Sequence, residues 1–143
     1  MNKKGFSLVE LIVSILILSV VMLFVGIAYV SSLNLIDSNR NLSLAYAALR
    51  QKAEELRTGD FDDVTAQTFY PENFAAGRAK GVVSVTDIDP RLKDVRIVIC
   101  WRTKNRVIGE DEDLDGVLDA DEDDNNNGLI DSPCVMQFSL ANR

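Results

Sequence analysis

An uncharged, apolar stretch near the amino terminus is the feature that most restricts what this chain can fold into. No charged side chain occurs from Leu11 to Ile36, and residues 11–30 are almost entirely apolar. About 20 such residues in a helix span the roughly 30 Å hydrocarbon core of a bilayer. Lys3 and Lys4 precede the stretch, so the positive-inside rule predicts a cytoplasmic amino terminus and an extracytoplasmic head.

The helical pattern continues beyond the apolar stretch. Leucines recur every seven residues on one side of the expected helix, at positions 35, 42, 49 and 56. No proline occurs between Phe6 and Arg57, and Gly59 follows as a stop signal. The pattern predicts one helix of about 50 residues, roughly 75 Å long. Its first half would lie in lipid, and its second half would pack along the leucine stripe.

Glu10 places a carboxylate at the edge of the apolar stretch. A charged carboxylate in hydrocarbon costs on the order of 3 kcal/mol on insertion scales. Its side chain either reaches the headgroups, because it lies near the helix end, or meets a cation. A cut after Gly5 would give Phe6 a new α-amine, and in a bundle of staggered copies this amine could pair with a neighbour's Glu10. Such a pair would fix the register between copies more than it would add net stability.

Residues 3–10, KKGFSLVE, followed by the uncharged stretch, resemble the class III leader of type IV prepilins and type II secretion pseudopilins. The resemblance covers residues 1 to about 57, and residues 45–57 are more similar to minor subunits than to a major pilin. It implies cleavage between Gly5 and Phe6 by prepilin peptidase and N-methylation of Phe6. It also implies storage in the inner membrane, an inner-membrane assembly platform and a filament of pilin subunits, with Glu10 as the family's characteristic glutamate.

After Gly59 the sequence changes to loop signals and short strands. Alternation predicts strands over residues 82–88, 94–102 and 135–140. Apolar side chains at 95, 97, 99 and 101 share one face, which we expect to lie against the helix. The expected fold class is α+β: a long helix, transmembrane in its first half, packed on a small antiparallel sheet with a calcium-binding loop.

The pattern divides the chain into segments with different roles. We expect a leader at residues 1–5, a transmembrane and polymerisation half of the helix at 6–30, and an amphipathic half at 31–58. A β head follows at 59–143 and carries an acidic insertion at 109–132.

Cys100 and Cys134 are the chain's two cysteines. In an extracytoplasmic domain an even pair favours a disulfide. The chain-entropy treatment gives roughly 3–4 kcal/mol for closing a loop of about 35 residues. The alternative is two free, buried thiols. Strand parity places Cys100 opposite Trp101, so the bond would lie off the main core face.

Residues 110–131 form an acidic segment that contains an internal repeat. The segment holds eleven of the chain's 22 acidic residues and no basic residue, which argues against binding phosphate or nucleic acid there. Residues 111–119 are matched twelve positions later by residues 123–131, and both copies read D-x-[DN]-x-[DN]-G-apolar-apolar-D. A random acidic segment would not contain the same spacing of acids, the same glycine and the same apolar pair twice.

Hard oxygen atoms at this spacing favour calcium, which takes about six to eight oxygen ligands. The candidate ligands of the first repeat are Asp111, Asp113, Asp115, the Val117 carbonyl, Asp119 and, at the twelfth position, Glu122. Those of the second are Asp123, Asn125, Asn127, the Leu129 carbonyl and Asp131. Because Cys134 occupies the twelfth position of the second repeat, that repeat must borrow an acid such as Asp121, take water or bind more weakly. The segment resembles the helix-free calcium repeats of thrombospondin type 3 modules, and we expect one or two calcium ions; the alternative is a solvated acidic run.

The chain has no histidine, which excludes a Ser-His-Asp or Cys-His centre and a His-ligated metal site. We therefore expect a structural subunit and not an enzyme: a minor pilin or pseudopilin of a type IV pilus or a type II secretion pseudopilus. The alternative is a secreted calcium-dependent binding module, released by ordinary signal peptidase after Ala28. The mature amino terminus separates them, because the first hypothesis predicts N-methyl-Phe6 and the second predicts Tyr29.

Overall fold

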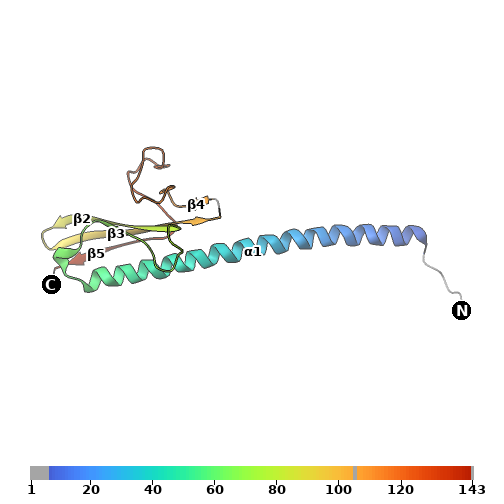
Figure 1. Cartoon of the computed structure of the whole chain (residues 1–143), viewed down its shortest axis with the longest axis horizontal. Coiled ribbons are helices and arrows are strands. Elements are labelled where there is room, and N and C mark those ends of the chain that lie inside the picture. The colour runs from blue at the N-terminus through green and yellow to red at the C-terminus, as the bar shows by residue number, and fades with distance from the viewer. Residues whose placement is uncertain (1–6, 105, 143) are drawn as a thin grey trace. The chain divides into compact units, whose positions relative to one another are not determined.

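The computed structural model describes residues 7–104 and 106–142, so Gly5 and Phe6 lie outside the described residues. Figure 1 shows a long helix followed by a small sheet. The elements in chain order are α1 (Leu8–Thr58), the 3-10 helix η1 (Phe61–Asp63), β1 (Gln67–Phe69), β2 (Ala79–Asp89), β3 (Leu92–Thr103), β4 (Arg106–Ile108) and β5 (Val135–Ala141). They form two compact units, Met1–Ser38 and Asn39–Arg143.

The first unit contains the amino-terminal part of α1. The helix is long and apolar enough to cross a membrane by length and composition, and its side chains in this unit are exposed. Two of its serines bond within the helix: the hydroxyls of Ser14 and Ser32 donate to main-chain carbonyls one turn earlier, at 2.7 and 2.9 Å. A helix in lipid must satisfy its polar groups internally, and these two hydroxyls do so.

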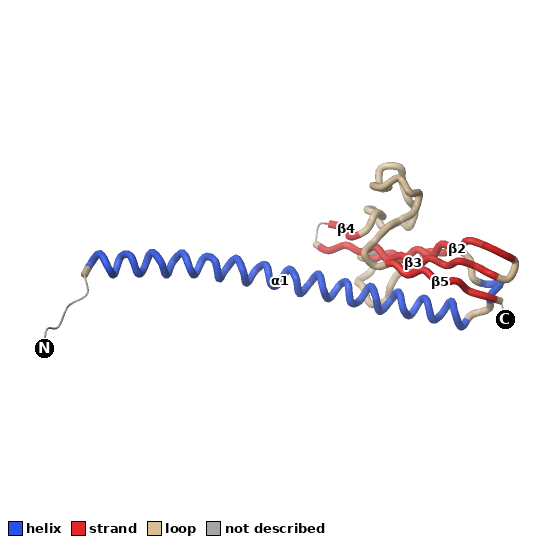
Figure 2. Tube along the Cα trace, turned by 180° about the vertical axis from the view of Figure 1, so that it is seen from behind, coloured by secondary structure: helices blue, strands red, loops and turns tan. Residues whose placement is uncertain are grey.

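The second unit contains a five-stranded antiparallel sheet in which β3 is central. β2 pairs with β3 over nearly its whole length and carries β1 on its other edge. On the opposite edge of β3, β5 pairs with the first part, from Leu92↔Ala141 to Val98↔Val135, and β4 pairs with the last three residues. The acidic segment therefore leaves the sheet after β4 and returns to the same edge at β5 (Figure 2).

One face of the sheet packs against the carboxyl-terminal part of α1, as predicted. The core cluster joins Leu49 and Leu56 of the leucine stripe to the alternating residues of β3, which are Val95, Ile97, Ile99 and Trp101. Small residues such as Ala45 and Ala53 also lie in this cluster, where they let the helix approach the sheet closely. Burying a leucine or isoleucine side chain contributes about 1.5–3 kcal/mol, so this layer is the main apolar core of the head.

Part of the other face of the sheet is covered by the acidic segment. A second apolar cluster joins Val98 and Cys100 of β3 to Leu114 and Ile130 of the segment. Both views show the segment on the side of the sheet away from α1 (Figures 1 and 2). The segment is thus attached to the sheet by a small core of its own.

Candidate functional site

The acidic segment is held at both of its ends. It begins at Gly109, whose φ is +112° and where an added Cβ would lie 2.3 Å from the Cys100 sulfur atom. At its other end the Ser132 hydroxyl donates to the Ile99 carbonyl at 2.6 Å, and the Tyr46 hydroxyl donates to the Pro133 carbonyl at 3.1 Å. Only a glycine fits the first of these positions, because the left-handed φ and the close sulfur atom both oppose a side chain.

In the first repeat, three aspartates accept hydrogen bonds from the backbone of the same turn. The two oxygens of Asp111 accept from the amides of Asp115 and Gly116 at 3.0 and 3.1 Å. Asp113 accepts from the Asp115 amide at 3.0 Å, and Asp115 accepts from the Val117 amide at 2.7 Å. One oxygen atom from each of these three aspartates lies within 4.8 Å of the others, a spacing that can hold a metal ion.

The second repeat forms the same four bonds. Asp123 accepts from the amides of Asn127 and Gly128 at 3.1 and 2.9 Å. Asn125 accepts from the Asn127 amide at 3.0 Å, and Asn127 accepts from the Leu129 amide at 2.7 Å. The repeat of sequence is therefore also a repeat of backbone conformation, with the oxygen atoms of both copies held at equivalent places.

The two repeats differ in how they contact the sheet. Gly116 and Gly128 both have positive φ, +86° and +72°. A Cβ on Gly116 would lie 2.8 Å from Thr68 of β1 and 3.0 Å from Lys80 of β2, whereas a Cβ on Gly128 would meet nothing within 4 Å. The first repeat is thus packed against the sheet, and the glycine turn of the second is open.

A glutamate closes the first repeat, at the twelfth position where the sequence predicted one. Glu122 is 9% exposed, and its two oxygens accept from the amides of Glu112 and Asp119 at 2.8 and 3.3 Å. The backbone of the turn therefore fixes this carboxylate on the same loop as Asp111.

Sequence reasoning missed two residues that hold the second repeat. Arg96 of β3 donates to the Ile130 carbonyl at 2.8 Å and forms an ion pair with Asp131. Glu110 accepts from the Asp131 amide at 2.9 Å and from the Asn125 side-chain amide at 3.3 Å. Asp121, the example that we gave of an acid the second repeat could borrow, is exposed. Arg96 has no signal in the sequence, because a strand basic residue and a loop acid 35 residues away carry no shared pattern.

The pKa of an aspartate is shifted in opposite directions in the two repeats. Burial raises the pKa of Asp111 from its ordinary 3.8 to about 6, because the charged form loses its hydration. By contrast, hydrogen bonds from the side-chain amides of Asn125 and Asn127, together with the charge of Arg96, lower the pKa of Asp131. The first repeat therefore holds a buried carboxylate whose ionised form is disfavoured unless a cation is close.

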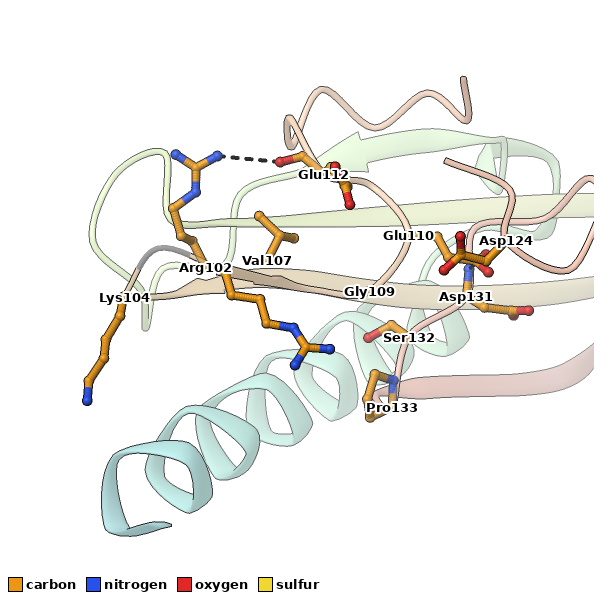
Figure 3. Close-up of a pocket in the computed structure, with 11 residues that line it drawn as sticks. Arg102, Lys104, Val107, Gly109, Glu110, Glu112, Asp124, Asp131, Ser132 and Pro133 are labelled. Atoms are coloured by element: carbon orange, nitrogen blue, oxygen red, sulfur yellow. Dashed lines mark hydrogen bonds between the residues drawn. The ribbon is translucent and has the colours of Figure 1, made fainter. Parts of the chain in front are cut away.

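An open cavity of about 940 Å³ lies beside the acidic segment (Figure 3). Arg102 lines it and donates to the main-chain carbonyl of Glu112 at 3.4 Å. The other charged lining residues are basic side chains of the β3–β4 turn and of β4 and acids of the segment: Lys104, Arg106, Glu110, Glu112, Asp124 and Asp131. The lining contains charges of both signs, so the cavity lacks the predominantly basic lining of a typical anion-binding site.

Both cysteines are buried, free thiols in the structure. Cys100 belongs to the apolar cluster under the acidic segment, whereas Cys134 belongs to the core cluster that faces α1. Burial raises the pKa of each thiol to about 11. The structure does not contain the disulfide expected from the sequence, and the bond stays a prediction.

Glu10 lies in the first turn of α1 and is exposed, at the start of the membrane-capable stretch. The fold is thus α+β, with an amino-terminal helix that is long and apolar enough to cross a membrane. Residues 1–26 match the prokaryotic N-terminal methylation motif. This motif is the class III prepilin leader of type IV pilins, and it covers the first 26 residues of the chain. Searches of curated proteins and of solved structures found no significant match.

Proposed function

We propose that this chain is a minor pilin or pseudopilin, a structural subunit of a type IV pilus or a type II secretion pseudopilus. The methylation motif at residues 1–26 carries the proposal, because it includes the start of a helix whose apolar side chains are exposed throughout the described residues 8–38. Lipid would cover these side chains before assembly, and the helices of other subunits would cover them in the filament. Prepilin peptidase and the inner-membrane assembly platform are the implied partners, and the head would lie outside the cytoplasm.

In this proposal Glu10 sets the register of the filament. After cleavage the N-methylated amine of Phe6 would be the cation that meets Glu10 of a neighbouring subunit. Pairing the two charges offsets the unfavourable free energy of a carboxylate in apolar surroundings. Loss of one partner would leave the other charge unpaired there, which is destabilising. Only the correct stagger between subunits brings the two groups together.

We further propose that the acidic segment binds one or two calcium ions and that these ions stabilise the head. The donor set supports a hard cation, because the first repeat presents carboxylate and carbonyl oxygens, and the second adds the side-chain amide oxygens of Asn125 and Asn127. The described residues of the turns offer no sulfur or imidazole. In the first repeat Asp111, Asp113 and Asp115 would hold the ion, with Glu122 at the twelfth position. In the second, Asp123, Asn125 and Asn127 present the equivalent oxygens. A bound cation would neutralise carboxylates that otherwise repel one another.

The mature amino terminus tests the first proposal. Mass spectrometry of the chain isolated from its own cells should give a polypeptide that begins with N-methyl-Phe6. A chain that begins at Tyr29 would instead identify an ordinary secreted protein, and a chain that keeps residues 1–5 would exclude processing by prepilin peptidase. The same measurement, made with and without reduction, determines whether Cys100 and Cys134 are joined.

Substituting Glu10 tests the role of the charge pair. We expect Glu10→Ala to be cleaved normally after Gly5 but to be lost from purified filaments, because the neighbour's amine loses its partner. Ser14→Ala, one turn further along α1, is the matched control and should assemble normally, since its hydroxyl only donates to the Glu10 carbonyl. Normal filament incorporation of Glu10→Ala would contradict the proposed mechanism.

A further inference from the structure

The second repeat has no carboxylate at its own twelfth position, where Cys134 stands. In the first repeat this position is Glu122, which contacts the ninth-position residue Asp119 twice. A side-chain oxygen of Glu122 accepts from the Asp119 amide at 3.3 Å, and the amide of Glu122 donates to the Asp119 carbonyl at 3.1 Å. This pair of contacts closes the first repeat.

Glu110 makes the same pair of contacts with the second repeat. Its side-chain oxygen accepts from the amide of Asp131, the ninth-position residue, at 2.9 Å. Its own amide donates to the Asp131 carbonyl, also at 2.9 Å. Glu122 and Asp119 are three residues apart, whereas Glu110 and Asp131 are 21 residues apart, so one contact is local and the other is tertiary.

The sequence around the two glutamates explains this equivalence. Glu110 directly precedes Asp111, the first residue of the first repeat, and Glu122 directly precedes Asp123, the first residue of the second. Each glutamate therefore leads one repeat and closes the other. The remaining oxygen of Glu110 accepts from the side chain of Asn125, a third-position candidate ligand, at 3.3 Å.

We infer that Glu110 supplies the carboxylate that completes the second calcium loop, so that the two repeats exchange their leading glutamates. The inference rests on the proposed calcium function. It answers the question that the sequence left open, namely which acid the second repeat borrows. The inference also implies that the two repeats bind calcium as one structural unit. Glu110 follows β4 and Asp131 precedes β5, so the second loop is complete only when both ends of the segment lie together on the sheet.

Calorimetric titration of the full-length protein in detergent micelles with calcium chloride tests the inference. The wild type should bind two calcium ions. Glu110→Gln should weaken one site about ten-fold or more and leave the other unchanged. Glu112→Gln is the matched control, because it removes the same charge from the same segment at an exposed side chain. It should bind two ions with affinities close to those of the wild type.

A second pair of variants assigns the weakened site. In Glu122→Gln, which should weaken the first site, the second site should weaken about ten-fold or more when Glu110→Gln is added and keep its affinity when Glu112→Gln is added. Terbium luminescence lifetimes in light and heavy water give an independent readout. Terbium bound to the Glu122→Gln protein should gain coordinated water on addition of Glu110→Asp, which shortens the side chain but keeps its charge and serves if the glutamine variant does not fold.

The possible failures are distinguishable. A wild type that binds no calcium would overturn the proposed calcium function itself. A wild type that binds a single ion, or a Glu110→Gln protein that matches Glu112→Gln in both sites, would overturn only the role given to Glu110. Loss of both sites in a folded Glu110→Gln protein would also contradict the assignment to the second repeat.

Discussion

The two acidic repeats have nearly the same local structure and very different surroundings. The first is packed against β1 and β2, and its leading aspartate, Asp111, is fully buried. The second presents an open glycine turn, and contacts with Glu110 and Arg96 hold its ninth residue. The comparison shows that the repeated motif determines the backbone of each turn, whereas residues outside the motif determine how each turn is attached and how its charges behave.

Removing calcium should have the largest effect, because it acts on both repeats at once. If calcium is present at about 100 times its dissociation constant, chelation raises the population of the opened segment about 100-fold for each bound ion. Limited proteolysis should then cut within residues 109–131 much faster, while α1 stays helical by circular dichroism. Magnesium is the control cation and should protect less, because it prefers octahedral geometry and keeps its waters. Equal digestion with and without calcium would contradict calcium binding by the segment.

The two turn glycines offer a matched pair with a smaller effect. Gly116→Ala and Gly128→Ala both force alanine into a positive φ, which costs about 1 kcal/mol or more in each repeat. Gly116→Ala also places a Cβ against Thr68, so it should lower the free energy of unfolding by roughly 1–3 kcal/mol more than Gly128→Ala. Denaturant titration of the calcium-loaded protein measures the difference. Equal losses in the two variants would show that the first repeat is not packed on the sheet as described.

Much of the fold could be predicted because its signals are local. The seven-residue leucine spacing predicted α1, which ends at Thr58 just before Gly59, and alternation predicted β2, β3 and β5. The strands β1 and β4 were missed because three residues are too few to show a period of two. β1 is a strand because it pairs with β2, and β4 is a strand because it pairs with β3. The sequences of these two short segments contain no pattern that predicts this pairing.

In the candidate site, too, the local contacts could be predicted from the sequence and the long-range contacts could not. The two turns follow from the repeated motif, since each of their hydrogen bonds joins residues at most five positions apart. The contacts of Arg96 and Glu110 with the second repeat span 35 and 21 residues, so they depend on how β3, β4 and β5 pair. For Glu110 a signal was present, because the Glu-Asp dipeptide occurs at the start of both repeats. The exchange of partners could be recognised only with the fold in hand.

The smallest expected effect is a difference in pH dependence between the repeats of the metal-free protein. Because the pKa of Asp111 is raised from 3.8 to about 6 on folding, the folded state holds more protons than the unfolded state between these values. The contribution of Asp111 to stability is therefore largest below about pH 4 and is lost as the pH rises to about 6. Asp131 acts in the opposite direction, because its pKa is lowered: it stabilises the fold above its ordinary value, and this stability is lost as the pH falls.

Denaturant titrations in chelator between pH 4 and pH 7 separate these contributions. Asp111→Asn should reduce the decrease in stability between about pH 4 and pH 6, because the asparagine does not titrate and keeps an oxygen for the Asp115 or Gly116 amide. A smaller decrease should remain, because burial also raises the pKa of Asp119. Asp131→Asn should keep that decrease, since Asp111 is still present in the first repeat. If Asp111→Asn instead shows the wild-type slope in this range, burial in the first repeat does not penalise the charged carboxylate, and the electrostatic contrast between the two repeats is wrong.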